Sequence, residues 1–340
     1  MILNIYMNIL VTGGAGFIGS NFIRQIIKKY PNYKIVNLDK LTYAGNLNNL
    51  KDIEGNANYK FIKGDIAEER IVNKILRNGR FDAIINYAAE THVDRSITGP
   101  EDFVRTDVIG TYRILEAVKE FKIPRFIQIS TDEVYGSIKK GTFSENSPLN
   151  PSSPYSASKA SGDLLCRSYI TTYNLPIIIT NACNMYGPYQ YPEKLIPLFI
   201  TNLLEQKKVP VYGQGENIRE WLYVLDHCNA IDFLLHKGEL GQSYNIGSGV
   251  EKNNLEITKL ILSELGFTEE MIEYVKDRPG HDWRYALDFK KITKLGWQPE
   301  FTFAEAIRET IRWYRQNKWW WQPLKSGEYL EYYKKQYQTL

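Results

Sequence analysis

The sequence contains few of the residues from which disulfide frameworks and metal centres are built. Three cysteines occur among 340 residues, at positions 166, 183 and 228, and none belongs to a C-x-x-C pair. An odd number of widely spaced cysteines argues against a disulfide framework and against a zinc site. The four histidines are equally scattered. We therefore expect buried free thiols and no metal.

Long apolar runs and blocks of one charge are also missing. Lysine and arginine number 42 against 39 acidic residues, a net charge of +3, and no basic run could follow a phosphate backbone. No apolar stretch is long enough to cross a membrane, and the residues before Asn8 lack the charged start of a signal peptide. We expect a cytoplasmic protein that binds neither nucleic acid nor membranes.

The sequence does contain a regular alternation of strand and helix patterns over its first two thirds. Apolar runs bounded by turn residues predict strands at 8–12, 34–39, 59–63, 83–87, 125–130 and 177–182. Helical periodicity predicts helices at 68–77, 102–121 and 154–173. This alternation indicates an α/β fold with a Rossmann-type, doubly wound parallel sheet, which binds ligands at the carboxyl ends of its strands.

From about residue 185 the alternation loosens, and turn clusters such as Tyr212-Gly213-Gln214-Gly215 become frequent. We expect a smaller, loop-rich C-terminal lobe that closes over the sheet and binds substrate. The predicted division is a dinucleotide-binding domain at 1–184, with strand and helix contributions from later segments, and a substrate lobe at 185–340.

A glycine-rich turn, Gly13-Gly14-Ala15-Gly16-Phe17-Ile18-Gly19, follows the first predicted strand and opens a helix. Glycines at 13, 16 and 19 permit a tight turn, close approach of the backbone to a pyrophosphate, and close packing of helix on strand. Asp39 ends the second predicted strand about twenty residues later, where a carboxylate can bind both hydroxyls of an adenosine ribose. Because Asp39 would repel a 2′-phosphate, NAD is favoured over NADP, although Lys40 lies beside it.

Two later strand ends offer weaker candidates for cofactor contact. Asp65 and Ile66 follow the third predicted strand and could hold an adenine ring. Ala88 and Ala89 follow the fourth and are small enough for a cofactor to lie close, although packing of helix on sheet would also explain them.

Tyr155 and Lys159 are four residues apart on a predicted helix and therefore share a face. Tyrosine is a poor base because its pKa is about 10, but the Lys159 ammonium can lower that pKa and bind a nicotinamide ribose. Tyr155 could then take the proton of a substrate hydroxyl while NAD accepts a hydride.

The segment Ser130-Thr131-Asp132-Glu133 adds an acid and a base ahead of that pair. Such a set suits elimination of water rather than simple oxidation. For Asp132 to donate a proton, burial or the neighbouring charge of Glu133 must raise its pKa.

These features resemble the extended short-chain dehydrogenase/reductase family of nucleotide-sugar enzymes, and within it the 4,6-dehydratases. The resemblance covers nearly the whole chain, from about Asn8 to the region of Tyr333. It is carried by Asp-Lys-Leu-Thr-Tyr-Ala-Gly-Asn at 39–46, His-Val-Asp-Arg-Ser-Ile at 92–97, Ser-Thr-Asp-Glu-Val-Tyr-Gly at 130–136 and Asp-Arg-Pro-Gly-His-Asp at 277–282.

The resemblance implies a role for each residue of the acid–base set. Thr131 would bind the sugar near O4, Asp132 would protonate the departing C6 hydroxyl, and Glu133 would remove the C5 proton. It also implies a tightly bound NAD that is recycled in each turnover. The implied substrate is dTDP-glucose, in deoxysugar biosynthesis of the dTDP-rhamnose type.

The sites implied by the resemblance are larger than those indicated by the residues alone. The cofactor site would comprise Gly13, Gly16, Phe17, Ile18, Gly19, Asp39, Lys40, Leu41, Thr42, Asp65, Ile66, Ala88, Ala89, Thr106, Tyr155 and Lys159. The nucleotide-sugar site would comprise Thr91, Thr131, Asn184, Lys194, Leu195, Pro210, Tyr212, Arg219, Asn254, Asp277, Arg278 and His281. Lys194 and Arg219 suit a diphosphate, arginine through its bidentate fork. Met185 departs from the family, which usually has a second asparagine there.

Other functions remain open on the same fold. A 4-epimerase would keep Tyr155 and Lys159 but usually has small hydroxyl residues in place of Asp132 and Glu133. A UDP-glucose 4,6-dehydratase would differ in its base by one methyl group, on which the sequence does not decide. A catalytically silent NAD-sensing protein would be expected to lose Tyr155 or Lys159, and a reductase would consume reduced cofactor.

Two further predictions concern packing between segments or subunits. Members of the resembling family pair the helices that correspond to 102–121 and 154–173, which implies a homodimer. In those helices, apolar positions such as Val104, Leu115 and Leu164 could serve either core or interface. We interpret the aromatic tail that begins at Trp319-Trp320-Trp321 as packing or a subunit contact rather than a binding site.

Overall fold

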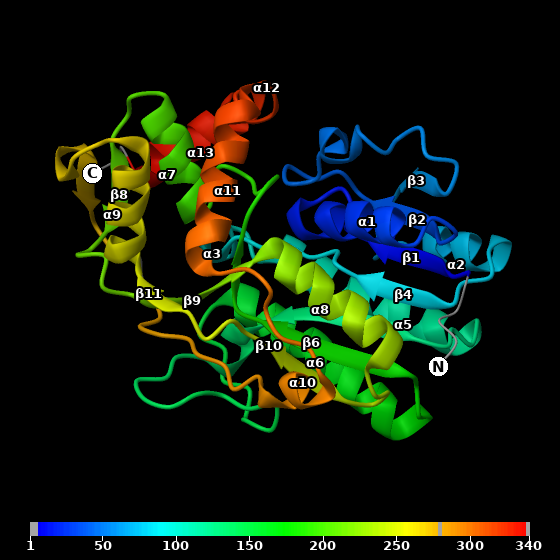
Figure 1. The fold of residues 1–340 in the computed structure, drawn as a ribbon. Coiled ribbons are helices and arrows are strands. Elements are labelled where there is room, and N and C mark those ends of the chain that lie inside the picture. Colours follow the sequence, from blue (N-terminus) through cyan, green and yellow to red (C-terminus); the bar gives the residue numbers. More distant parts are fainter. Residues whose placement is uncertain (1–5, 278–280, 338–340) are drawn as a thin grey trace.

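A seven-stranded sheet forms the centre of the molecule in the computed structural model, which describes residues 6–277 and 281–337. Its strand order is β10-β6-β5-β4-β1-β2-β3, and every pair is parallel (Figure 1). The strands are β1 (Asn8–Thr12), β2 (Lys34–Asp39), β3 (Tyr59–Lys63), β4 (Ala83–Asn86), β5 (Phe126–Thr131), β6 (Ile177–Ala182) and β10 (Ser243–Ile246). The predicted doubly wound parallel sheet is confirmed, and a strand from beyond residue 184 completes its edge.

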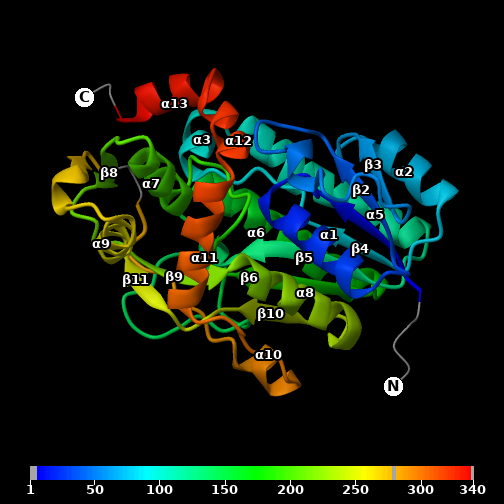
Figure 2. The same ribbon diagram turned by 45° about the horizontal axis from the view of Figure 1, so that its top comes forward.

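Helices cover both faces of this sheet. The helices α1 (Phe17–Lys29) and α8 (Val224–Lys237) pack on one face, and α2 (Glu69–Asn78), α5 (Thr111–Glu120) and α6 (Pro154–Tyr173) pack on the other (Figures 1 and 2). Side chains alternate along β1, so that Ile9 and Val11 join the core under α1 while Leu10 joins the core under α2 and α5. Because the side chains on both faces of the sheet are buried, the strands appear in the sequence as continuous apolar runs.

The strand order reverses direction at β1, which has β2 on one side and β4 on the other. The chain runs outward from β1 through β2 to β3 and then returns to β4. Connections leave in opposite directions at this point, and a crevice therefore opens at the carboxyl ends of the strands. The glycine turn and the ends of β4 and β5 meet there.

The predicted helix at 102–121 is confirmed as an unbroken helical segment, but its middle is π-helical rather than α-helical. The chain there forms α4 (Glu101–Phe103), the π-helical segment η2 (Val104–Gly110) and then α5. By contrast, α6 has the predicted bounds. Ser153 caps it by accepting a hydrogen bond from the Ser156 amide, and Pro154 occupies its first turn.

The C-terminal part has more regular structure than the expected loop-rich lobe, so that expectation was wrong. Asn253 and Thr302, residues typical of turns, form capping boxes that begin helices. A three-stranded sheet is formed by β11 (Glu251–Asn253), β9 (Ile218–Tyr223) and β7 (Asn184–Tyr186), and β12 (Ile272–Val275) pairs with β8 (Val209–Tyr212). The helices of this part are α7 (Leu195–Leu204), α9 (Asn254–Leu265), α10 (Lys290–Leu295), α11 (Phe303–Gln316), α12 (Lys318–Trp321) and α13 (Glu328–Tyr337).

Short helical elements complete the chain. They are η1 (Leu47–Leu50), α3 (Val93–Thr98), η3 (Asp132–Tyr135), η4 (Glu269–Met271) and η5 (Pro323–Lys325). Most C-terminal elements, among them α7, α9, α13 and β8, lie together beside the large sheet (Figures 1 and 2).

The aromatic tail packs largely as predicted. Trp320 and Trp321 are buried, and their indole N–H groups donate to Asn49 Oδ1 at 2.7 Å and to the Tyr314 carbonyl at 2.8 Å. Trp319 remains exposed. Within 6–277 and 281–337, no helix has the length and apolar character that a bilayer crossing requires.

Candidate functional site

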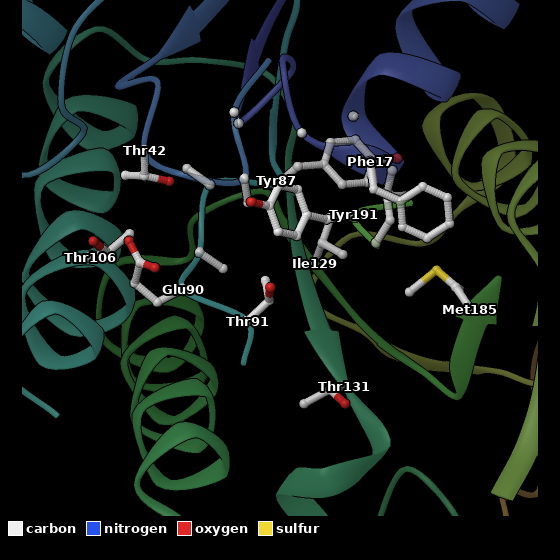
Figure 3. A pocket seen from close by; sticks show the side chains of 18 of the residues that line it. Phe17, Thr42, Tyr87, Glu90, Thr91, Thr106, Ile129, Thr131, Met185 and Tyr191 are labelled. Carbon is white, nitrogen blue, oxygen red and sulfur yellow. The ribbon is translucent and has the colours of Figure 1, made fainter. Parts of the chain in front are cut away.

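A cavity opens at the carboxyl end of the large sheet, where the strand order reverses (Figure 3). We call it the first cavity. Figure 3 shows Thr42 and Thr106 toward one end of it and Met185 toward the other. Most residues predicted for the cofactor line it, namely Gly13, Gly16, Phe17, Ile18, Gly19, Asp39, Lys40, Thr42, Ile66, Ala88, Ala89, Thr106, Tyr155 and Lys159.

Two predicted cofactor residues, Leu41 and Asp65, are not part of this lining. Asp65 instead accepts the Ala67 N–H at 2.9 Å and pairs with Lys40 at 3.1 Å and Arg105 at 3.3 Å. Leu41 uses its backbone N–H to hold Asp39, at 2.8 Å. Both residues therefore contact residues of the lining, and their own contact with a cofactor stays a prediction.

The glycine turn has a shape that fits a dinucleotide. Gly13 has a φ of 67°, and a Cβ there would lie 2.5 Å from the Ala88 backbone nitrogen. A Cβ at Gly19 would lie 2.5 Å from the Gly13 carbonyl oxygen. Gly16 is the N-cap residue of α1 and provides no side-chain cap, so the first N–H groups of the helix face the cavity without a competing side chain. These features suit a pyrophosphate.

Asp39 lies where the ribose of such a ligand is expected. Its carboxylate accepts the backbone N–H groups of Ala15 at 2.9 Å and Leu41 at 2.8 Å. Burial raises the pKa of Asp39, and the two backbone hydrogen bonds oppose that shift. The neighbouring Lys40 pairs with Asp65, which removes the main argument for a 2′-phosphate at this position.

Thr131, Asp132 and Glu133 lie at the end of β5 and the start of η3. The Thr131 hydroxyl accepts the Glu133 N–H at 3.3 Å and donates to Asp132 Oδ1 at 3.2 Å. Asp132 is 1% exposed, and its Oδ2 has no hydrogen-bond partner among the described residues. Burial, followed by the charges of Glu133 and Glu220, raises the pKa of Asp132 well above its usual range. Asp132 therefore meets the requirement for a protonated acid.

Tyr155 and Lys159 are buried beside this group and line the first cavity. The Lys159 ammonium donates to the Ile129 carbonyl at 2.8 Å. Burial, followed by the charges of Glu133 and Asp107, raises the pKa of Tyr155 well above its usual range, and a hydrogen bond with Thr131 opposes that shift. The expectation of a lowered pKa was therefore wrong for this arrangement, because burial and the surrounding carboxylates raise it.

A second cavity adjoins the first and shares five of its lining residues, Thr91, Glu133, Asn184, Glu193 and Lys194. Most residues predicted for the substrate line it, namely Thr91, Asn184, Lys194, Leu195, Pro210, Tyr212, Arg219, Asn254 and His281. Thr131 lines the first cavity instead. Asp277 is not part of either lining and pairs with His281 Nδ1 at 2.6 Å, while Arg278 lies outside the described residues.

Cationic side chains give the second cavity its chemical character. Arg219 is 6% exposed, donates to the carbonyls of Ile218 at 2.7 Å and Asp282 at 3.1 Å, and lies over the Tyr285 ring. Lys194 donates to the Thr91 carbonyl at 2.7 Å. Where the cavities meet, the buried Asn184 Oδ1 has no partner among the described residues. A polar molecule with a diphosphate fits this lining.

Several lining residues were missed by sequence reasoning. In the first cavity they include Tyr43, Ala44, Gly45, Tyr87, Glu90, Met185, Gln190, Tyr191 and Glu193, and in the second His92, Val93, Asp94, Leu198, Phe199, Trp221, Tyr285 and Tyr337. Position inside the 39–46 string could have indicated Tyr43, and nearness to Lys194 could have indicated Glu193. Tyr337 belongs to the aromatic tail, for which a binding role was considered the weaker interpretation.

Glu90 is the most perturbed acid among the missed residues of the first cavity. Burial and the charge of Asp107 raise its pKa to about 7. Asp107 lies in the π-helical segment, where it accepts the Glu90 N–H at 3.2 Å and the Ser158 hydroxyl at 2.6 Å. In the part of the chain that the structure describes, no group of three or more histidine, cysteine or acidic side chains could hold a metal ion.

Comparison with known proteins agrees with this geometry. A family model described as GDP-mannose 4,6 dehydratase matches residues 10–310. A dTDP-glucose 4,6-dehydratase of Streptomyces niveus is 50% identical over 327 residues, which cover 95% of this chain and 97% of the relative.

Two solved structures are similar over nearly the whole chain. The dTDP-glucose 4,6-dehydratase of Bacillus anthracis in complex with NAD has a TM-score of 0.89 and 51% identity, covering 94% of this chain and 100% of the other. The dTDP-glucose 4,6-dehydratase DesIV of Streptomyces venezuelae, with NAD and dTDP bound, has a TM-score of 0.91 and 48% identity over the same shares.

Proposed function

The chain belongs to the GDP-mannose 4,6-dehydratase family, and from this premise we propose that it is an NAD-dependent dTDP-glucose 4,6-dehydratase. The enzyme converts dTDP-glucose into dTDP-4-keto-6-deoxy-glucose and water. The observation that carries this proposal is the environment of Asp132 and Glu133. A buried acid with a raised pKa stands next to a carboxylate that lines both cavities.

The first cavity would hold NAD through the glycine turn, Asp39, and the pair Tyr155 and Lys159. When bound, NAD supplies the two-electron acceptor that takes a hydride from C4 and returns it to C6. The side chains of the protein have three tasks around that exchange. They must move the proton of the C4 hydroxyl, move the proton of C5, and protonate the leaving hydroxyl of C6.

Tyr155 takes the proton of the C4 hydroxyl, and Thr131 orients that hydroxyl. The pKa of Tyr155 is raised in the structure, so the phenolate needs support when the proton moves. Thr131 supplies a hydrogen bond and Lys159, one helical turn along α6, supplies a positive charge on the same face.

Elimination follows from the ketone at C4, which makes the C5 proton acidic. Glu133 abstracts that proton while Asp132 protonates the C6 hydroxyl. The C5–H and C6–O bonds break, a C5–C6 double bond forms, and water leaves. Asp132 can begin this step because its pKa is raised and its Oδ2 is not engaged by another described residue.

The second cavity would hold the nucleotide diphosphate. Lys194 and Arg219 lie on its wall and provide charge for the phosphates, and Pro210, Tyr212, Asn254 and His281 line it with them. Arg278 remains a candidate by its position in the sequence beside Asp277.

The test uses the purified protein without added cofactor. Incubation with dTDP-glucose should give a product lighter by one water, while UDP-glucose, tested in parallel, should react more slowly. No mass change with either sugar, in protein shown to contain NAD, would contradict the proposed function.

We further propose a homodimer formed through η2, α5 and α6. Leu115 is buried in the core, but Leu164 and Val104 are 55% and 51% exposed on these helices, which supports an interface there. Leu164→Glu should convert a dimeric mass in solution to a monomeric one. A parent protein of monomeric mass would contradict the proposal.

The cellular setting is also a proposal. The three cysteines are buried free thiols, which suits a reducing compartment, and we place the enzyme in the cytoplasm. There its product would enter a deoxysugar route of the dTDP-rhamnose type.

A further inference from the structure

Three segments that are distant in the sequence meet beside the first cavity, and two of them, through Tyr43 and Glu193, line it. Tyr43 lies in the connection between β2 and η1, Arg95 lies in α3, and Glu193 lies just before α7. Tyr43 and Glu193 are 150 residues apart in the chain. Contact between them therefore joins the large sheet to the C-terminal part of the molecule.

The three side chains form a closed set of contacts. Tyr43 donates its hydroxyl to Glu193 Oε1 at 3.0 Å, and Arg95 Nε donates to Glu193 Oε2 at 3.2 Å. The Arg95 guanidinium also lies 3.8 Å from the centre of the Tyr43 ring. Each member thus contacts both others, and both oxygens of the carboxylate are used.

Burial and charge explain why this set holds together. Glu193 is 5% exposed, so its charge requires compensation. Burial raises the pKa of Glu193, and the charges of Lys194 and Arg95 with the Tyr43 hydrogen bond oppose that shift. Burial and the charge of Glu193 raise the pKa of Tyr43, which therefore remains a protonated donor. The ring of Tyr191 contacts the ring of Tyr43 edge-on, with 5.5 Å between the two ring centres.

Two members of the set, Tyr43 and Glu193, line the first cavity, and Arg95 contacts both of them. Tyr43 follows Asp39, where the adenosine ribose is expected, by four residues. Glu193 lines both cavities and so reaches the region where the sugar would meet the cofactor. A dinucleotide bound in the first cavity would therefore lie against Tyr43 and Glu193.

We propose that Tyr43, Glu193 and Arg95 close the first cavity and keep the reduced dinucleotide in place between the two halves of the reaction. The inference rests on the proposed function, because retention matters only when the electrons taken from C4 must return to C6 of the same sugar. In this role Tyr43 is a positioning residue. It acts on the cofactor rather than on the substrate, from its own place in the lining and through its hydrogen bond to Glu193.

The direct test measures how quickly the holoenzyme loses NAD in the absence of any sugar. Tyr43→Phe keeps the ring under Arg95 but removes the hydroxyl that Glu193 accepts. Loss of a hydrogen bond to a charged group should accelerate NAD dissociation about tenfold. The release of labelled NAD, followed by rapid gel filtration after dilution into unlabelled NAD, measures this rate.

Tyr30→Phe is the matched control. Tyr30 donates to Asp232 at 3.2 Å, and Lys29 pairs with the same carboxylate at 2.6 Å, so the change removes an equivalent hydroxyl. Neither Tyr30 nor Asp232 lines the first or the second cavity. The NAD dissociation rate of Tyr30→Phe should equal that of the parent protein. Equal retention in Tyr43→Phe and the parent, or equal loss in Tyr43→Phe and Tyr30→Phe, would overturn the proposal.

A second variant and a second readout test the proposal independently of NAD release from Tyr43→Phe. Arg95→Lys keeps the charge but loses the planar contact with Tyr43, and it should release NAD faster in the same way. During turnover of dTDP-glucose, lactate dehydrogenase with pyruvate captures escaped NADH as lactate, which should increase in both variants. Failure of the proposed function would appear separately, as a parent protein that retains NAD but dehydrates no sugar.

Discussion

Asp132 and Glu133 are neighbours in the chain but have different surroundings. Asp132 is 1% exposed and its pKa is raised well above the usual range, whereas Glu133 is partly exposed and lines both cavities. Two carboxyl groups whose environments separate them in this way can act as acid and base in one step. The proposed division of roles between Asp132 and Glu133 rests on this difference.

Substitution of each acid should separate water loss from the preceding oxidation. Asp132→Asn and Glu133→Gln should slow dehydration by about 10²–10⁴-fold, because each removes one proton transfer. Oxidation at C4 should be affected less, so the near-ultraviolet absorbance of reduced nicotinamide should persist after mixing with dTDP-glucose.

Exchange of the C5 hydrogen with heavy water distinguishes the two variants. Asp132→Asn retains the base and should still exchange that hydrogen, while Glu133→Gln should not. Unchanged overall turnover in Glu133→Gln would contradict its assignment as the base.

Tyr155→Phe should stop the reaction at its beginning. The variant cannot accept the proton of the C4 hydroxyl, so reduced nicotinamide should not appear when dTDP-glucose is added. Its NAD content after purification should match that of the parent, since the ring and Lys159 remain. Normal cofactor reduction in a variant with full NAD content would contradict the role of Tyr155.

The pairing of Lys40 with Asp65 should contribute to the preference for NAD. Asp65→Ala removes the carboxylate that lies 3.1 Å from the Lys40 ammonium and frees a cation beside the ribose site. The affinity of the apoprotein for NADP, relative to NAD, should rise several-fold. In the double variant Asp65→Ala with Lys40→Ala, the relative affinity for NADP should return to that of the parent. A relative affinity that stays high would show that Lys40 does not cause the increase.

Asp163 should make the protein less stable as the pH rises through the acid range. Burial raises its pKa from 3.8 to about 6, against hydrogen bonds from Ser130 and Asn181. The folded state thus binds a proton that the unfolded state releases, and the free energy of unfolding falls between pH about 4 and about 6. The shift corresponds to about 3 kcal/mol. In Asp163→Asn, the free energy of unfolding, measured with urea at several pH values, should decline less steeply over this pH range. An unchanged decline would exclude Asp163 as the cause of the pH dependence.

The sequence was sufficient for the features that depend on local pattern. Apolar runs located the first six strands, and helical periodicity gave the bounds of α6. The glycine turn and Asp39 could be placed at strand ends, which meet at one edge of a parallel sheet whatever the details of packing. These predictions needed no knowledge of distant contacts.

Features that depend on the three-dimensional environment could not be obtained in that way. The π-helical turn at 104–110 keeps the apolar periodicity of a helix but presents Asp107 to Ser158 and Glu90. The pKa of Tyr155 was expected to fall, and it rises because Tyr155 is buried and because carboxylates of η2 and η3 lie near it. Contact between Tyr43 and Glu193 joins positions that no local pattern connects.

Transfer of a label within a single turnover tests the central claim most directly. dTDP-glucose that carries deuterium at C4 should yield a product with deuterium on C6, because NAD held in the first cavity passes it from one carbon to the other. Product whose C6 carries only hydrogen, formed by protein with its full content of NAD, would contradict the account.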